Sequence, residues 1–145
     1  MESYFMELSN KIGIEITQKQ INNFFEYKKL LIEKNKYVNL TAIVEDRDVI
    51  LKHFIDSLTI NKYISNNSSL IDVGTGAGFP GIPLKIIRED VEVLLLDSLN
   101  KRLNFLNEVI ETLNLKDIKT VHGRAEDLSR QDIYREKFDY VTARA

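Results

Sequence analysis

The sequence predicts an α/β fold in which a doubly wound parallel sheet follows a helical region. Apolar residues recur at helical spacing before residue 68, whereas short apolar runs alternate with amphipathic segments after it. A glycine-rich turn directly after the first of these runs is the third observation. The polar stretch Asn66–Ser69 joins the two parts. We therefore expect an all-helical cap over residues 1–67 and an α/β region over residues 68–145.

The helical part carries recognisable helix starts. Thr17-Gln18-Lys19-Gln20 has the form of a capping box, and the apolar residues that follow lie on one face of a long helix. A short helix over residues 4–12 precedes it. After a break at residues 35–41, the segment from Val49 to Ile60 has an amphipathic pattern with acidic residues before it, which predicts one further helix.

The α/β part repeats one scheme. Buried-strand patterns occupy residues 70–73, 91–96, 118–121 and 138–143. Apolar residues between Leu99 and Leu113 recur at spacings of four and three, Pro80 suits the first turn of a helix, and residues 125–133 suit a short helix or turn. This alternation predicts a parallel sheet with right-handed crossovers. The sheet would normally continue after residue 145, so we expect a truncated chain with an open edge strand and an uncovered sheet face.

Composition excludes several classes of site. The chain of 145 residues has Lys+Arg 20 against Asp+Glu 22, a net charge of -2, no cysteine and two histidines. Disulfides, thiolate catalysis and Cys-ligated zinc are therefore absent, and we expect no metal site. No stretch is long and apolar enough to span a membrane, and the first residues are acidic where a signal peptide is basic. We expect a cytoplasmic protein. Because the pI is near 5.7, any contact with nucleic acid requires a local basic patch.

The glycine-rich turn indicates a nucleotide-like ligand. Gly74, Gly76 and Gly78 let the backbone turn sharply after a strand, and the next helix offers free N–H groups. Gly76-x-Gly78-x-x-Gly81 matches the dinucleotide fingerprint, which alone is a weak signal. Asp97, which ends the second strand, can accept hydrogen bonds from ribose hydroxyls of either a dinucleotide or S-adenosylmethionine.

The negative charge of Asp72 distinguishes between a dinucleotide and S-adenosylmethionine as the ligand. A carboxylate at the mouth of the turn repels a pyrophosphate but is compatible with the sulfonium and ammonium of S-adenosylmethionine. The charge therefore favours the methyl donor. Alternatively, Asp72 is a buried acid that accepts hydrogen bonds from N–H groups of the turn itself and shapes the site indirectly.

Several motifs together resemble the glucose-inhibited division protein B family over nearly the whole chain and in the right order. The matching segments are Asn39–Ala42, His53–Leu58, Asp72–Leu84, Asp97–Ser98, Lys101–Arg102, Phe105–Leu106, Gly123–Asp127 and Thr142–Ala145. The resemblance implies a class I S-adenosylmethionine-dependent methyltransferase with a Rossmann-like fold, incomplete here. It also implies a substrate, N7 of a guanine in bacterial 16S rRNA, and a partner, the small ribosomal subunit. We expect a monomer.

The glycine turn and the resemblance together give a set of predicted cofactor residues. Gly74 and Phe79 would line the methionine end of the cofactor, Asp97 with its neighbours would hold the ribose and one edge of the adenine, and residues 125 and 126 would meet the adenine. Arg144 would lie on the substrate side. Phe79 and Leu99 could instead be core residues, and Arg144 a solvated terminal residue. The full set is Asp72, Gly74, Gly76, Gly78, Phe79, Asp97, Ser98, Leu99, Ala125, Glu126 and Arg144.

The implied chemistry needs no general base, because guanine N7 already presents a lone pair at neutral pH. We therefore predict no catalytic residue, and interpret His53 and His122 as structural histidines. The densest basic stretch is a candidate RNA contact or simply the solvated face of a helix. It comprises Lys28, Lys29, Lys34 and Lys36, and Arg124 and Arg144 are the other candidates.

Two other functions remain open from the sequence. A nicotinamide- or flavin-dependent oxidoreductase would use Gly76, Gly78 and Gly81, and it would bind a dinucleotide rather than S-adenosylmethionine. A non-catalytic nucleotide-binding module would bind the cofactor without methylating RNA.

Overall fold

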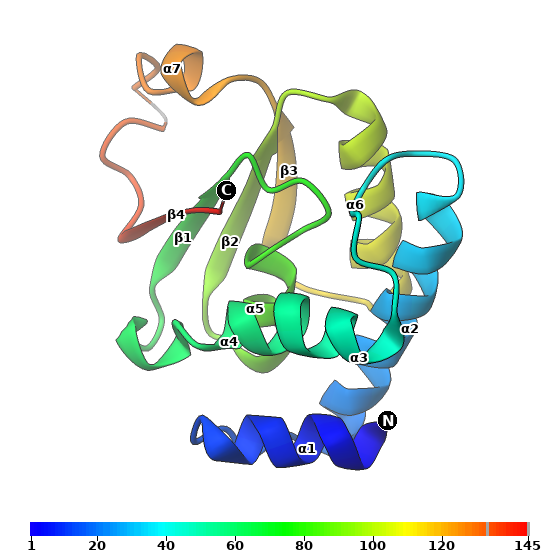
Figure 1. Cartoon of the computed structure of the whole chain (residues 1–145). Coiled ribbons are helices and arrows are strands. Elements are labelled where there is room, and N and C mark those ends of the chain that lie inside the picture. Colours follow the sequence, from blue (N-terminus) through cyan, green and yellow to red (C-terminus); the bar gives the residue numbers. More distant parts are fainter. Residues whose placement is uncertain (133, 145) are drawn as a thin grey trace.

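The computed structural model describes residues 1–132 and 134–144, and its centre is a four-stranded parallel sheet (Figure 1). Residues 133 and 145, which end the predicted 125–133 segment and the Thr142–Ala145 motif, lie outside the described residues. The strands are β1 (Ser69–Val73), β2 (Glu92–Asp97), β3 (Ile118–His122) and β4 (Tyr140–Ala143). All four predicted strands are thus confirmed, with ends shifted by one or two residues.

The strand order is β3-β2-β1-β4. The chain runs outward from β1 to β3 and then returns to place β4 on the other side of β1, so the winding direction reverses between β1 and β4. The register aligns the carboxyl ends of the strands, with Asp97 opposite His122 and Val73 opposite Ala143. In sheets of this kind ligands bind at these ends, beside the reversal.

Helices cover the two faces of the sheet unequally. α5 (Gly81–Ile87) and α6 (Asn100–Thr112) pack on one face together with the N-terminal helices, and the large core lies there. The other face has a small cluster of apolar side chains beneath α7 (Ala125–Leu128), which lies on the opposite side from α6 in Figure 1. β3 and β4 are the two edge strands, and Val141 of β4 is 68% exposed. The expected open edge is therefore present among the described residues.

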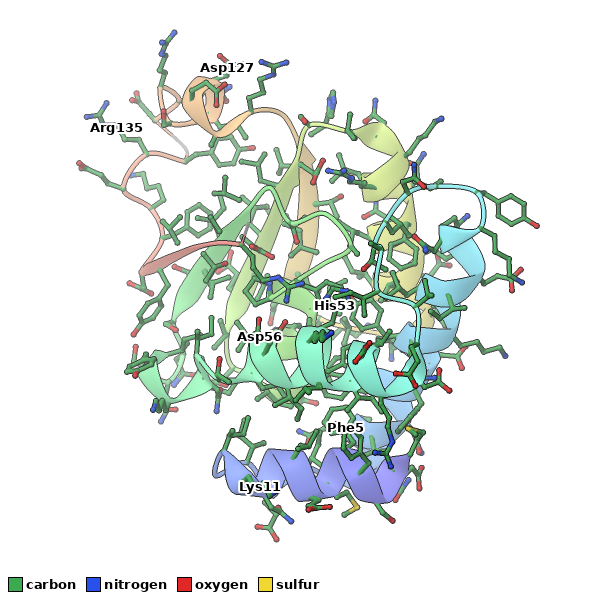
Figure 2. The ribbon with its side chains drawn as sticks, in the orientation of Figure 1. Phe5, Lys11, His53, Asp56, Asp127 and Arg135 are labelled. Carbon is green, nitrogen blue, oxygen red and sulfur yellow. The ribbon has the colours of Figure 1, made fainter. Side chains whose placement is uncertain are left out.

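The N-terminal region is helical throughout its regular elements. α1 (Glu2–Lys11) and α2 (Gln18–Asn35) match the predicted helices, and both hydrogen bonds of the Thr17 and Gln20 capping box are present. Figure 2 shows Phe5 pointing from α1 toward the helical segment above it, where its ring lies 6.0 Å from that of Phe54. None of the described helices is long and apolar enough to cross a bilayer.

The predicted helix from Val49 to Ile60 is not a single α-helix. It consists of α3 (Asp46–Asp48), the π-helix η1 (Val49–Ile55), α4 (Asp56–Leu58) and, just beyond, the 3₁₀ turn η2 (Asn61–Tyr63). The predicted amphipathic pattern holds even so, because the buried side chains recur along the whole segment. They are Val49, Ile50, His53, Phe54, Ile55, Ser57 and Leu58.

The helical region and the glycine turn share one core. Tyr27 is fully buried, its ring lies 5.6 Å from that of Phe79, and its hydroxyl donates a hydrogen bond to the carbonyl oxygen of Ala77. Phe54 completes this contact from η1, with its ring 5.5 Å from that of Tyr27. The turn is therefore packed from below by side chains that belong to α2 and η1.

Replacing Tyr27 by Phe tests this connection. The Tyr27→Phe variant keeps the ring but leaves the buried Ala77 carbonyl without its donor, so we expect it to lower the free energy of unfolding by about 1–2 kcal/mol. Urea denaturation measures the change. Tyr37→Phe is the matched control, because Tyr37 is 78% exposed and should change stability by less than about 0.5 kcal/mol. Equal stabilities of the two variants would contradict the expectation.

Candidate functional site

A pocket of about 320 Å³ opens at the carboxyl ends of β1, β2 and β3. The pocket is lined by residues of the glycine turn, of the end of β2 and of the segment after β3. The fold therefore brings together positions that are far apart in the sequence. The lining residues are Val73, Gly74, Leu96, Asp97, Ser98, Gly123, Arg124, Ala125 and Glu126. Five of these, Gly74, Asp97, Ser98, Ala125 and Glu126, belong to the predicted cofactor set.

Asp97 ties the glycine turn to β2. Its side chain is 2% exposed; Oδ2 accepts a hydrogen bond from the Gly76 N–H at 2.9 Å, and Oδ1 accepts one from the Leu99 N–H at 3.0 Å. The Arg102 guanidinium lies 3.6 Å from Oδ2. An ionised carboxylate offers about four lone-pair positions, so two backbone bonds leave capacity for further donors from the pocket.

Asp72 lies beneath the turn and has no exposed surface. Its Oδ2 accepts hydrogen bonds from the Thr75 hydroxyl at 2.7 Å and the Gly81 N–H at 3.0 Å, and its Oδ1 accepts one from the Thr142 hydroxyl at 3.1 Å. These hydrogen bonds agree with the alternative interpretation of Asp72 given above, in which it is a buried acid that holds the turn and does not contact the ligand directly. Burial raises the pKa of the Asp72 carboxyl to about 6, against the opposing effect of these hydrogen bonds and of Arg144.

The raised pKa of Asp72 predicts a specific pH dependence of stability. Between the ordinary pKa of 3.8 and about 6, the folded state binds the proton more readily than the unfolded chain, so the stability that protonated Asp72 contributes is lost as the pH rises through about 6. Asp72→Asn is neutral at every pH and can keep the hydrogen bonds. Its free energy of unfolding should therefore gain about 2 kcal/mol relative to the parent chain between pH 4.5 and 7.5.

Urea titrations of the parent chain and of Asp72→Asn at several pH values measure this difference. The other titratable groups are common to both proteins and cancel in the comparison. A difference that stays constant across this pH range would show that Asp72 is not the group responsible.

Gly78 and Phe79 face the helical region instead of the pocket. Gly78 has φ +106°, and a Cβ there would lie 2.7 Å from the Tyr27 hydroxyl oxygen, so the turn requires glycine at this point. Phe79 is 5% exposed, and its ring stacks on that of His53 at 4.2 Å with an interplanar angle of 9°. Phe79 therefore has the core position that the sequence left open as its alternative.

Gly76, Leu99 and Arg144 also lie outside the pocket lining. Gly76 contributes its N–H to Asp97, as described above, and Leu99 is 49% exposed, so it is not a core residue. The Arg144 side chain is half-buried and lines two other cavities, of about 540 and 340 Å³, which it shares with Asp56 and Thr59. It is thus neither in the pocket nor a loose, solvated side chain.

Two supporting residues were not predicted from the sequence. Thr142 bonds Asp72 from the neighbouring strand, and Thr41 bonds His53. Their partners lie 70 and 12 residues away, so no local spacing could reveal them. Thr41 and Thr142 do stand in two of the matching motifs, Asn39–Ala42 and Thr142–Ala145, and this was the only available signal.

The predicted basic stretch on α2 is largely paired within the chain. Lys28 contacts Asp46 at 2.6 Å, Lys34 contacts Glu108 at 3.6 Å, and Lys36 contacts a glutamate one turn earlier at 3.8 Å. These ion pairs favour the interpretation as a solvated helix face. Arg124, in contrast, lines the pocket.

Comparison with solved structures concerns the fold. Coclaurine N-methyltransferase bound to N-methylheliamine and SAH aligns with 95% of this chain and 37% of its own, with a TM-score of 0.55 and 16% identity. At this identity the likeness concerns the fold alone. The shared architecture is the Rossmann-like parallel sheet that the motifs predicted.

Sequence comparison then identifies the family. Residues 20–145 match the GidB family, described as rRNA small subunit methyltransferase G, and the chain belongs to that family. Ribosomal RNA small subunit methyltransferase G of Leuconostoc mesenteroides is 52% identical over 145 residues, which cover 97% of this chain and 61% of the relative. The protein of the same name from Clostridium botulinum strain Loch Maree is 55% identical over 138 residues, covering 94% and 58%. The chain thus spans about three fifths of the length of these relatives.

Proposed function

We propose that this chain is the S-adenosylmethionine-binding part of an enzyme that methylates N7 of a guanine in 16S rRNA of the small ribosomal subunit. The observation that carries the proposal is the pocket at the strand ends, where five predicted cofactor residues meet. Membership of the GidB family supports the RNA substrate. A cytoplasmic, monomeric enzyme is part of the same proposal, because ribosomal RNA is its substrate.

The residues of the pocket suit this cofactor. We assign the ribose hydroxyls to the free lone pairs of Asp97, whose position is fixed by the two backbone bonds described above. Glu126 is exposed at the pocket wall and offers an acceptor for the adenine amino group, and the small side chain of Ala125 leaves room for the ring. When bound, S-adenosylmethionine supplies an electrophilic methyl group on a sulfonium.

The same turn does not suit a dinucleotide. A pyrophosphate needs free backbone N–H groups at the turn and at the start of the next helix. In this chain five N–H groups of the turn and of the start of α5 already have acceptors within the protein, and the carboxylate of Asp72 lies directly beneath. The occupied N–H groups are those of Thr75, Gly76, Gly78, Phe79 and Gly81. This arrangement favours the methyl donor over the oxidoreductase alternative.

Methyl transfer to N7 requires the protein to align the reactants, but it does not require a general base. Guanine N7 carries an in-plane lone pair at neutral pH, so no proton has to be removed before the methyl group is transferred. Holding reactants in a near-attack geometry supplies up to about 7–11 kcal/mol in well-oriented systems. His53 is not available as a base, because both of its ring nitrogens are hydrogen-bonded to protein groups.

Calorimetric titration of the chain tests the cofactor assignment. We expect saturable binding of S-adenosylmethionine and none of NAD or FAD. Asp97→Ala should weaken binding at least tenfold, and Glu126→Ala several-fold, because each removes a charged hydrogen-bond acceptor. Glu111→Ala, on the exposed side of α6, is the matched control and should leave the Kd unchanged.

Methylation itself is tested with the complete reading frame that encodes this chain. Small ribosomal subunits from cells that lack the enzyme should gain one 7-methylguanosine in 16S rRNA, detected by mass spectrometry of nucleosides. Reconstitution with RNA that contains 7-deazaguanosine should abolish the product, since that base has no N7. Binding of the cofactor without any methylated RNA would favour a non-catalytic binding module, and tight binding of a dinucleotide would refute the proposal.

A further inference from the structure

Three distant segments meet in a chain of hydrogen bonds on the β4 side of the glycine turn. Arg144, which follows β4, places Nη2 2.6 Å from Nδ1 of His53 on the π-helix. Nε2 of His53 lies 2.7 Å from Oγ1 of Thr41, and that hydroxyl also accepts a hydrogen bond from the Ile43 N–H at 3.0 Å. Figure 2 shows His53 on the helical segment that also carries Asp56.

The hydrogen-bond partners of His53 determine the protonation state and the tautomer of its imidazole ring. An arginine side chain only donates, so Nδ1 of His53 must be the acceptor and the ring must be neutral, with its proton on Nε2 and directed at Thr41. The surroundings agree with a neutral ring. Burial and the charge of Arg144 lower the pKa of His53 to about 4, and the Asp56 carboxylate opposes this effect.

Phe79 completes the support of the guanidinium. The ring of His53 stacks on Phe79 as described above, and Cζ of Arg144 lies 5.0 Å from the centre of the same ring. The two ring systems therefore hold the Arg144 guanidinium from two directions.

Part of the guanidinium is left for a ligand. Nη1 has only long contacts, 3.4 Å to Oδ2 of Asp56 and 3.5 Å to the carbonyl oxygen of Lys52. Arg144 lines the two cavities of about 540 and 340 Å³, and the carboxylate of Asp56 lines both of them. Lys52 adds a second positive charge to the larger cavity, with its ammonium 3.6 Å from the exposed carboxylate of Asp48. The smaller cavity also includes Pro80 of the glycine turn and Thr142 of β4, where the sheet reverses its winding.

We propose that His53, itself held by Thr41, is a positioning residue that directs Arg144 toward an anionic group bound beside the carboxyl end of β4. The anion is either the carboxylate of the methyl donor or a phosphate of the RNA, since a guanidinium recognises both with the same paired N–H groups. This inference rests on the proposed function. It assigns a role to a histidine that the sequence indicated only as structural.

The test is a double-mutant cycle in the complete reading frame. His53→Phe keeps an aromatic ring against Phe79 but removes the acceptor for Arg144. His53→Gln supplies a neutral side chain with an acceptor oxygen. It is the control that distinguishes loss of the hydrogen bond from loss of folding. Each substitution is combined with Arg144→Ala. The measured quantities are the Kd of S-adenosylmethionine, the Kd of 5′-methylthioadenosine, which lacks the amino-acid part, and the KM for small ribosomal subunits.

We expect His53→Phe to weaken one of these interactions about tenfold and His53→Gln to recover most of the loss. In the Arg144→Ala background, His53→Phe should change the same quantity less than twofold. Weaker binding of S-adenosylmethionine with unchanged binding of 5′-methylthioadenosine identifies the carboxylate as the anion. A raised KM for the ribosomal subunit, with unchanged cofactor binding, identifies an RNA phosphate. Equal losses in both backgrounds, or no loss at all, overturn the proposal.

A spectroscopic readout separates this inference from the proposed function. Nitrogen-15 NMR of the histidines should show His53 as a neutral ring with an unprotonated Nδ1 at pH 6 in the parent chain. A proton on Nδ1, or a charged ring, would overturn the positioning role whatever the methylation assay gives. Absence of cofactor binding and methylation in the unmodified enzyme would instead refute the proposed function.

Discussion

The candidate site depends on two buried carboxylates that hold the glycine turn from neighbouring strands. Asp72 of β1 accepts hydrogen bonds from Thr75 and from the Gly81 N–H, and Asp97 of β2 accepts one from the Gly76 N–H. A segment with three glycines at positive φ would otherwise sample many conformations. Hydrogen bonds to charged acceptors are among the stronger ones, so these two side chains select one conformation of the turn and place the pocket wall beside β2.

The helical region packs directly against the glycine turn and supports it. Tyr27 bonds the turn from α2, and the ring of Phe79 is inserted between side chains of α2 and η1. Two different cavities therefore lie on opposite sides of the turn. The pocket with Asp97 and Glu126 lies on one, and the Arg144 guanidinium lies on the other.

Local patterns were sufficient for most elements. The four apolar runs became the four strands, the capping box at Thr17 began α2, and the acid that ends β2 reached the pocket. These features depend on residues within a few positions of one another. Two features were exceptions. The amphipathic pattern after Val49 did not reveal the π-helical hydrogen bonding of that segment, and Phe79 became a core residue because α2 and η1 supply its neighbours.

The sequence by itself determined the order of strands and helices, the glycine turn, and the family that those motifs define. The elements and the turn follow from short-range spacing, which the backbone geometry of strands and helices translates directly into structure, and the family follows from the resemblance of motifs along the chain. Only the tertiary structure decided which side chains face the pocket and which lie beneath it. Asp72 stands one residue before the end of β1 and Asp97 ends β2, yet Asp72 is enclosed by Thr75 and Thr142 while Asp97 lines the pocket. That distinction, like the approach of Arg144 to His53 across 91 positions, arises from packing between segments and leaves no periodicity to recognise.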